Sequence, residues 1–231
     1  MAYTHRGSSS NIIVGAASLF TYEGPTGLGG ELSEGDLPAY EDGKSYRESL
    51  QAGASASNDW LSTDGFRNVG YTMNGLEIQF QPDFGEVQVD QVLDVAKLYK
   101  QGMQVNLNTA FAESTLENLL FAIAAPSNDL SDLVVGTGIG TGSQELDLGS
   151  GDLGECPVER GLVAVGPGTG DCEVGSTIER VYVAYRALSI DNVTVAAKRD
   201  EATMFEVSFR LLPNSSGSYG KIVDRVIPTA P

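Results

Sequence analysis

Few residues of this 231-residue chain could perform acid–base or nucleophilic chemistry. The single histidine, His5, lies in a polar N-terminal stretch, which is an improbable setting for a catalytic triad. The two cysteines, Cys156 and Cys172, are sixteen positions apart and have no Cys or His partner at the spacing of a zinc site. A disulfide and two free thiols are both compatible with this spacing. The sequence therefore predicts a protein that is not an enzyme and that uses no metal or other cofactor.

Three further segments match known site motifs only in part. The run GTGIGTG at 136–142 lacks the spacing of a dinucleotide-binding loop, and no helical pattern follows it. The tripeptide DFG at 83–85 is not accompanied by any other kinase element. The acidic residues around Asp147, Asp152 and Glu155 do not follow the ligand spacing of a calcium-binding loop. The first is interpreted as a flexible loop and the second as a chance match, and a specific calcium site at the third is not favoured.

The charge of the chain restricts its partners. Asp and Glu number 31 against 14 Lys and Arg, which gives a formal net charge of −17. Because affinity for a phosphate backbone comes largely from Lys and Arg, this balance argues against a stable nucleic-acid binder and against a basic membrane-surface protein.

The longest apolar stretch, residues 12–20, is shorter than the roughly 20 residues of a membrane span. No membrane insertion is expected, and this stretch is interpreted as a first strand, with a signal peptide as the alternative.

The elements that would position any site are mostly strands. Apolar and polar residues alternate in three segments, 75–81, 86–91 and 104–111, which is the period of a half-buried strand. Each of these strands therefore has one apolar face and one wet face. The wet positions of the three segments contain no Lys or Arg; they are Glu77, Gln79, Gln81, Glu86, Gln88, Asp90, Gln104, Asn106 and Asn108.

One helix is predicted between Ser114 and Ala125. Ser114 and Glu117 fit a capping box, and Pro126 ends the pattern. The apolar stripe expected to pack against the sheet consists of Leu116, Leu119, Leu120 and Ile123. Further strands are predicted at 162–165, 181–190, 193–198, 203–212 and 221–227.

Three segments have the composition of loops or arms. Residues 21–65 are rich in Gly, Ser, Asp and Glu, residues 127–176 form an acidic, Gly-rich insertion, and residues 213–231 form a C-terminal arm. The seven or eight short strands and the one flanking helix predict a single mainly β domain, a β-sandwich or barrel with long loops. Such a sheet has edges that must be covered, charged or paired with another subunit.

Several segments together resemble the major tail tube proteins of long-tailed, siphophage-like bacteriophages. They are NIIVGAASLF at 11–20, NVGYTMNGLEIQF at 68–80, EVQVDQ at 86–91, AFAESTLENLLFAIA at 110–124 and SIDNVTVAAKRDEATMFEVSFRLLP at 189–213. Their order matches that family, and they cover under half of the chain. The departures are the insertion at 127–176, with its two cysteines, and the long 21–65 region. The insertion could serve as a decoration or adhesive element on the outside of a tube.

The resemblance implies a structural virion protein that stacks as hexameric rings into a tail tube for genome ejection. Its implied partners are copies of itself and the tape-measure, terminator and baseplate or distal tail proteins. Its implied location is the virion tail, after assembly in the host cytoplasm. Double-stranded DNA would pass through without being retained, so some of the nine wet residues are expected to line the lumen.

The resemblance also implies that the N-terminal segment, residues 21–65 and the C-terminal arm reach neighbouring rings. We accordingly expect deletion of residues 24–58 to leave a folded monomer that cannot polymerise. Two other classes remain open. One is a different component of the same fold, such as a tail terminator, a distal tail protein or a type VI secretion tube. The other is a monomeric β-sandwich module that binds carbohydrate or Ca²⁺.

Overall fold

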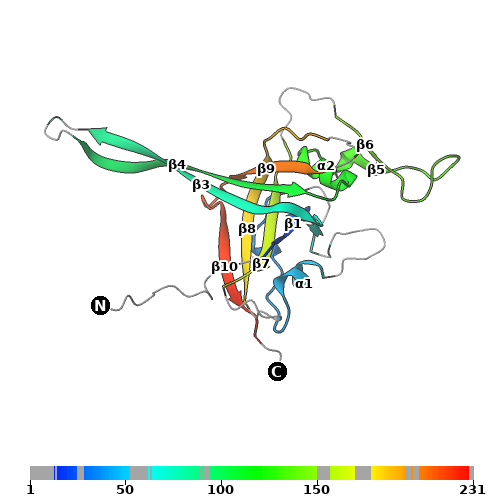
Figure 1. Cartoon of the computed structure of the whole chain (residues 1–231), viewed down its shortest axis with the longest axis horizontal. Helices are drawn as coiled ribbons and strands as arrows, with labels where there is room; N and C mark the ends of the chain where they lie inside the picture. Colours follow the sequence, from blue (N-terminus) through cyan, green and yellow to red (C-terminus); the bar gives the residue numbers. More distant parts are fainter. Residues whose placement is uncertain are drawn as a thin grey trace.

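The structure, a computed structural model, is mainly β and sandwich-like, as predicted (Figure 1). It describes residues 13, 15–24, 29–52, 62, 64–88, 90, 94–149, 157–169, 178–195, 199 and 203–228. The strands are β1 (Ser18–Tyr22), β2 (Phe66–Asn68), β3 (Thr72–Gln88), β4 (Val95–Phe111), β5 (Leu130–Asp132), β6 (Gln144–Leu146), β7 (Arg160–Pro167), β8 (Ile178–Ser189), β9 (Phe205–Leu212) and β10 (Gly220–Val226). The helices are α1 (Tyr46–Leu50) and α2 (Leu116–Ala122), with 3-10 turns at Glu34–Asp36 and Ser127–Asp129.

The main sheet is antiparallel and forks at β8. Its order is β2-β1-β7-β8-β9-β4-β3, and β10 also pairs with β8. The first part of β8 pairs with β10, from Ile178 opposite Val226 to Ala184 opposite Gly220. The end of β8 pairs with β9, as in the pair Ser189 and Phe209. The fork divides the sheet into two halves, β2-β1-β7-β8-β10 and β9-β4-β3, while β5 and β6 form a separate small hairpin.

The first hydrophobic core lies between these two halves. Alternate residues of β4 and β9, including Val105, Leu107, Phe209 and Leu211, meet residues such as Leu162 of β7. The opposite residues of β4 and β9 are mostly polar, with Ala110 and Leu212 as exceptions, so this half of the sheet has one buried and one largely wet face. The period-2 pattern of both segments therefore predicted the correct buried face.

A second core covers the other face of β1, β7 and β8. Strand β7 is buried on both faces, because Leu162 and Ala164 enter the first core while Val163 and Val165 enter the second. Its continuous apolar run is typical of a strand between two layers. The second core is closed by the segment 29–52, from which Leu32, Tyr46 and Leu50 are fully buried.

This packing corrects our interpretation of residues 21–65 as an arm. Within this range Tyr22 belongs to β1 and packs in the second core, and residues 29–52 cover that core. Deletion of residues 24–58 would expose core side chains, so we no longer expect it to leave a folded monomer. The described part of the C-terminal arm is likewise integrated, since β10 pairs with β8 along its whole length.

Strands β3 and β4 form a long hairpin that projects from the body (Figure 1). Each strand has 17 residues, and they pair from Thr72 opposite Phe111 to Gln88 opposite Val95. The sequence predicted two strands at 75–81 and 86–91, but β3 runs through both without a break. The strand predicted at 193–198 is absent over residues 193–195, and its other positions lie outside the described residues.

Helix α2 packs on the first core with a different face from the predicted one. Its N-cap is Thr115, whose side chain accepts from the Asn118 backbone N–H, so the proposed Ser114 capping box is wrong. The buried side chains are Asn118, Leu120, Phe121 and Ala122, whereas Ile123 is 39% exposed and Leu116 is half-buried. Leu119 is partly buried against the core, so of the predicted stripe Leu119 and Leu120 are the members that pack as expected.

Candidate interaction surface

The wet face of β3 and β4 is a ladder of polar side chains. Glu77 lies opposite Asn108, Gln79 opposite Asn106, and Gln81 opposite Gln104, so the register brings six predicted residues together. Along β3 the Gln79 amide donates to a Glu77 carboxylate oxygen at 2.9 Å, and along β4 the Gln104 amide donates to Asn106 at 3.2 Å. Cross-strand and same-face contacts of this kind fix the side chains in an ordered polar surface.

Strand β9 extends this surface by three residues that are not among the nine predicted wet residues. Ser208 lies opposite Asn108 and donates to its side-chain oxygen at 2.7 Å. Arg210 lies opposite Asn106, and Glu206 lies opposite Ala110. The alternation of residues 203–212 would have identified them, because the intervening Val207 and Phe209 are core residues. We call the combined surface the polar face; its members are Glu77, Gln79, Gln81, Gln104, Asn106, Asn108, Glu206, Ser208 and Arg210.

A polar trough of about 700 Å³ lies over this surface. Its lining includes Glu77, Asn106 and Ser208, with Asp191 and Asn192 from the segment after β8. Within the polar face the charged groups are two carboxylates and one guanidinium, so the surface is polar and close to neutral. It lacks the cluster of bases that would hold a phosphate backbone.

Glu86 and Gln88 do not share this face. The pairing of β3 with β4 shifts register at Asp83/Phe84 and at Val87/Gln88, and each shift skips a residue of β4. Because β3 itself gains no extra residue, its odd-numbered positions point to one side and its even-numbered positions to the other. Glu86 and Gln88 therefore lie on the side of Ile78 and Phe80. Asp90 lies in the turn beyond the strand. The nine wet residues predicted from the sequence thus divide into six that form one surface and three that do not.

The outer part of the β3–β4 hairpin, residues 80–88 and 94–101, exposes apolar side chains on both faces. We call this part the arm. Phe84 is 55% exposed, Leu98 60% and Tyr99 45%. Along its outer edge β3 pairs with no other described strand. A two-stranded hairpin is marginally stable in water by itself, and an unpaired edge is a template for another strand. The arm therefore has the properties of a surface that is covered in an assembly.

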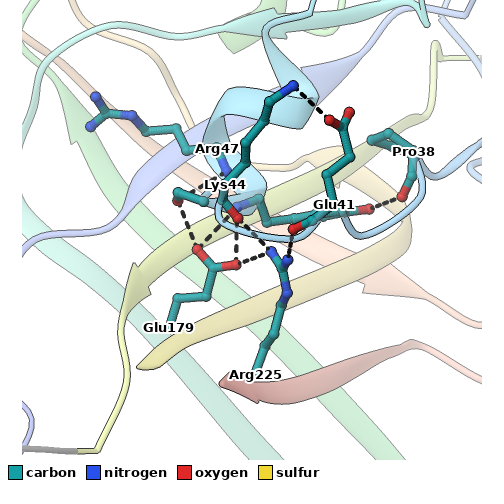
Figure 2. A network of polar contacts seen from close by, with 8 residues as sticks. Pro38, Glu41, Lys44, Arg47, Glu179 and Arg225 are labelled. Atoms are coloured by element: carbon teal, nitrogen blue, oxygen red, sulfur yellow. Dashed lines mark hydrogen bonds and ion pairs between the residues drawn. The ribbon is translucent and has the colours of Figure 1, made fainter. Parts of the chain in front are cut away.

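A buried ion pair attaches the segment 29–52 to the body (Figure 2). Arg225 of β10 donates to Glu179 of β8 at 2.7 Å, and both side chains are more than 90% buried. Glu179 also accepts from the Ser45 hydroxyl at 2.7 Å and from the Tyr46 backbone N–H at 2.9 Å. Arg225 further donates to the backbone carbonyls of Lys44 and Glu41. Burial of the Tyr46 side chain in this network raises the pKa of its phenol.

A second buried cluster joins α2 to strands β2 and β7. Arg160 donates to Glu23 at 2.9 Å and to the Ala125 carbonyl at 2.9 Å. Arg67 donates to the Asn118 side-chain oxygen at 2.9 Å, and burial lowers the pKa of Arg67. The Asn118 amide donates to the carbonyls of Val69 and Glu113, each at 2.9 Å. Asn118 therefore fixes α2 and the start of the β3–β4 hairpin relative to one another.

We expect Asn118→Ala to lower the free energy of unfolding by about 2–4 kcal/mol, because it leaves two carbonyls and one guanidinium with unmade hydrogen bonds at a buried site. Urea denaturation monitored by circular dichroism measures the change. Glu117→Ala, on the adjacent and less buried position of α2, is the matched control. Equal stabilities of the two variants would contradict the role assigned to Asn118.

The remaining predicted site residues are not placed. Cys156 and Cys172 both lie outside the described residues, as do His5 and the acidic positions Asp152 and Glu155. Among the described residues, no group of three or more His, Cys, Asp or Glu side chains could hold a metal ion. No helix in the described part of the chain is long and apolar enough to cross a membrane.

Comparison with known proteins finds no matching family model and no matching curated protein.

Proposed function

We propose that this protein is the major tail tube subunit of a long-tailed bacteriophage, which stacks as rings into a conduit for DNA. The observation that carries the proposal is the β9-β4-β3 half-sheet, with its ordered polar face, its free β3 edge and its projecting arm. The ordered set of sequence segments that resembles this family supports the same function.

The polar face suits the wall of a DNA conduit. Its amides, hydroxyl and carboxylates present no cluster of bases to the phosphates, so DNA can slide past without being retained. Arg210 is the one basic member, and Glu206 lies on the same face of the same strand. A single guanidinium per subunit among carboxylates and amides leaves the wall without a strong attraction for the duplex.

The free edge and the arm suit assembly. Burial of Phe84, Leu98 and Tyr99 against another subunit would remove exposed apolar surface, and pairing along β3 would satisfy its outward backbone groups. Pairing of the β3 edge with a different surface of the next subunit would be a heterologous contact, and heterologous contacts generate closed rings or open helical stacks. Both are needed for a tube of stacked rings.

Negative-stain electron microscopy of the purified protein across a concentration series tests the proposal, with light scattering on the same samples. We expect open tubes of stacked rings. Rings that never stack would contradict the tube function and favour a terminator-like component. A monomer at all concentrations that calcium or a glycan stabilises would instead favour the binding-module class.

A further inference from the structure

The first core is open to solvent at the base of the hairpin. A hollow of about 420 Å³ lies between β3, β4 and the start of β10, and it extends down to the core residues Val105 and Leu211. At its rim Phe80 is 55% exposed and Ile222 is 53% exposed. A second hollow of about 320 Å³ adjoins it and shares Ile78, Phe80, Tyr182 and Ile222. The volume lies within the range of pockets that hold drug-sized ligands.

Two lysines provide all the charge that lines this hollow. Its other lining residues are apolar or uncharged, while Lys100 and Lys221 lie at its margin. Lys221 forms an ion pair with Glu34 at 3.0 Å. Lys100 contacts the Met103 sulfur at 3.5 Å and forms no ion pair with any described carboxylate. The hollow thus fits an apolar group that carries a negative charge beside it.

The same chain presents such a group on the β5–β6 hairpin and its loop, residues 130–146, which we call the projection. Val134 is 86% exposed and Val135 is 61% exposed. Exposed Asp132 lies beside them, and residues 127–149 contain four acidic residues and no Lys or Arg. The loop is held by its own backbone hydrogen bonds, from Leu133 to Ser143 at 2.8 Å and between Gly136 and Ile139 at 3.1 Å. The two valines are therefore presented by a preorganised tip.

We propose that the projection of one copy inserts Val134 and Val135 into the hollow of a second copy, with Asp132 near Lys100. Figure 1 shows β5 and β6 beside α2, away from the arm, so the projection does not reach the hollow of its own copy. A contact between two different surfaces is heterologous and repeats from copy to copy, which gives rings or filaments. The proposal names one contact between copies of the proposed tube subunit. It rests on the proposed function only because both require the chain to self-associate.

Charge variants test the contact. Lys100→Glu should weaken self-association about tenfold or more, since a favourable charge pair becomes a like-charge pair with Asp132. Asp132→Lys in the same chain as Lys100→Glu should restore association. The matched control is Arg47→Glu, because Arg47 is exposed on α1 and belongs neither to the lining of the hollow nor to the arm. Sedimentation velocity across a concentration series gives the association constants, and thermal melting shows whether each variant is folded.

Val134→Asp provides a second variant that leaves the hollow unchanged, and Leu148→Asp, at a residue 73% exposed in the same insertion, is its control. Loss of one buried valine side chain corresponds to about tenfold to hundredfold weaker association. Association of Lys100→Glu and Val134→Asp at the wild-type level would overturn the proposal, as would a wild-type protein that stays monomeric.

Photo-crosslinking identifies the occupant directly. A benzoylphenylalanine at position 80, in a mixture of ¹⁴N- and ¹⁵N-labelled protein, should crosslink to residues 130–146 of the other copy. Two outcomes would show that something else occupies the hollow, and either would overturn the proposal. One is a crosslink to residues 1–12, and the other is a position 80 that decanoate protects from crosslinking while the second copy does not crosslink to it. Wild-type tubes that the charge variants do not weaken would leave the tube function standing. Oligomers that never form tubes, but whose association Lys100→Glu weakens, would support the proposed contact and contradict the tube function.

Discussion

Glu179→Ala should lower the free energy of unfolding by about 3–5 kcal/mol. The substitution removes the carboxylate that pairs with buried Arg225 and that accepts hydrogen bonds from Ser45 and Tyr46. Arg225 would remain buried without a counter-charge, and an uncompensated buried charge is the costly outcome of breaking such a pair. The segment 29–52 would also lose its attachment to β8, so the second core would open. Urea denaturation followed by tyrosine fluorescence and circular dichroism measures the change.

The neighbouring residues provide a control on the same two strands. Arg225 lies opposite Glu179 in the register of β10 and β8, and Asp224 lies opposite Arg180. Arg180 and Asp224 form a bidentate ion pair on the opposite, solvent-exposed side, which lowers the pKa of Asp224. Because exposed pairs contribute little, Asp224→Ala should change stability far less than Glu179→Ala. A similar effect of both substitutions would show that the buried network does not hold the segment.

Residues of the first core could be located from the sequence, whereas those that the segment 29–52 contributes to the second core could not. Strands β4 and β9 alternate strictly, so Leu107 and Phe209 were assigned to a buried face by period alone. Leu32, Tyr46 and Leu50 are separated by Gly-, Ser- and acid-rich sequence and share no period. Their burial depends on Glu179 and Arg225, more than 130 positions from Tyr46, and spacing along the chain cannot reveal such partners.

Six residues of the polar face were predicted from the sequence, but Glu86, Gln88 and Asp90 were grouped with them because β3 was not predicted as one strand. Residues 75–81 and 86–91 were predicted as two separate strands, and this separation placed Glu86 with Glu77 among the wet residues. Pro82 is tolerated within β3 because this strand is an edge strand, where a missing N–H leaves no ladder bond unmade. Because β3 is one continuous strand, Glu86 at an even position lies on the opposite face from Glu77 at an odd position. A single residue of register thus decides which side chains form the surface.

Lysines on the polar face should block the proposed conduit without preventing assembly. Gln79 and Asn106 lie directly opposite each other, near the middle of the polar face. Gln79→Lys combined with Asn106→Lys adds two positive charges per subunit, repeated around every ring, and these would hold the phosphates of the duplex. We expect tubes of normal appearance and ejection of DNA from reconstituted virions that is at least about tenfold slower, with the difference decreasing at high salt.

The opposite face of the same strand supplies the control. Glu86→Lys changes the charge by two units on β3 but lies on the side of Phe80 and Phe84, so it should leave the ejection rate of assembled particles near the wild-type rate. The ejection rate is measured from the fluorescence of a DNA-binding dye after the host-cell receptor is added to the virions. If Glu86→Lys slowed ejection while the double lysine variant did not, the lumen would be lined by the other face. If neither variant slowed it, the half-sheet would not line the lumen, and the tube would have to be built from other strands.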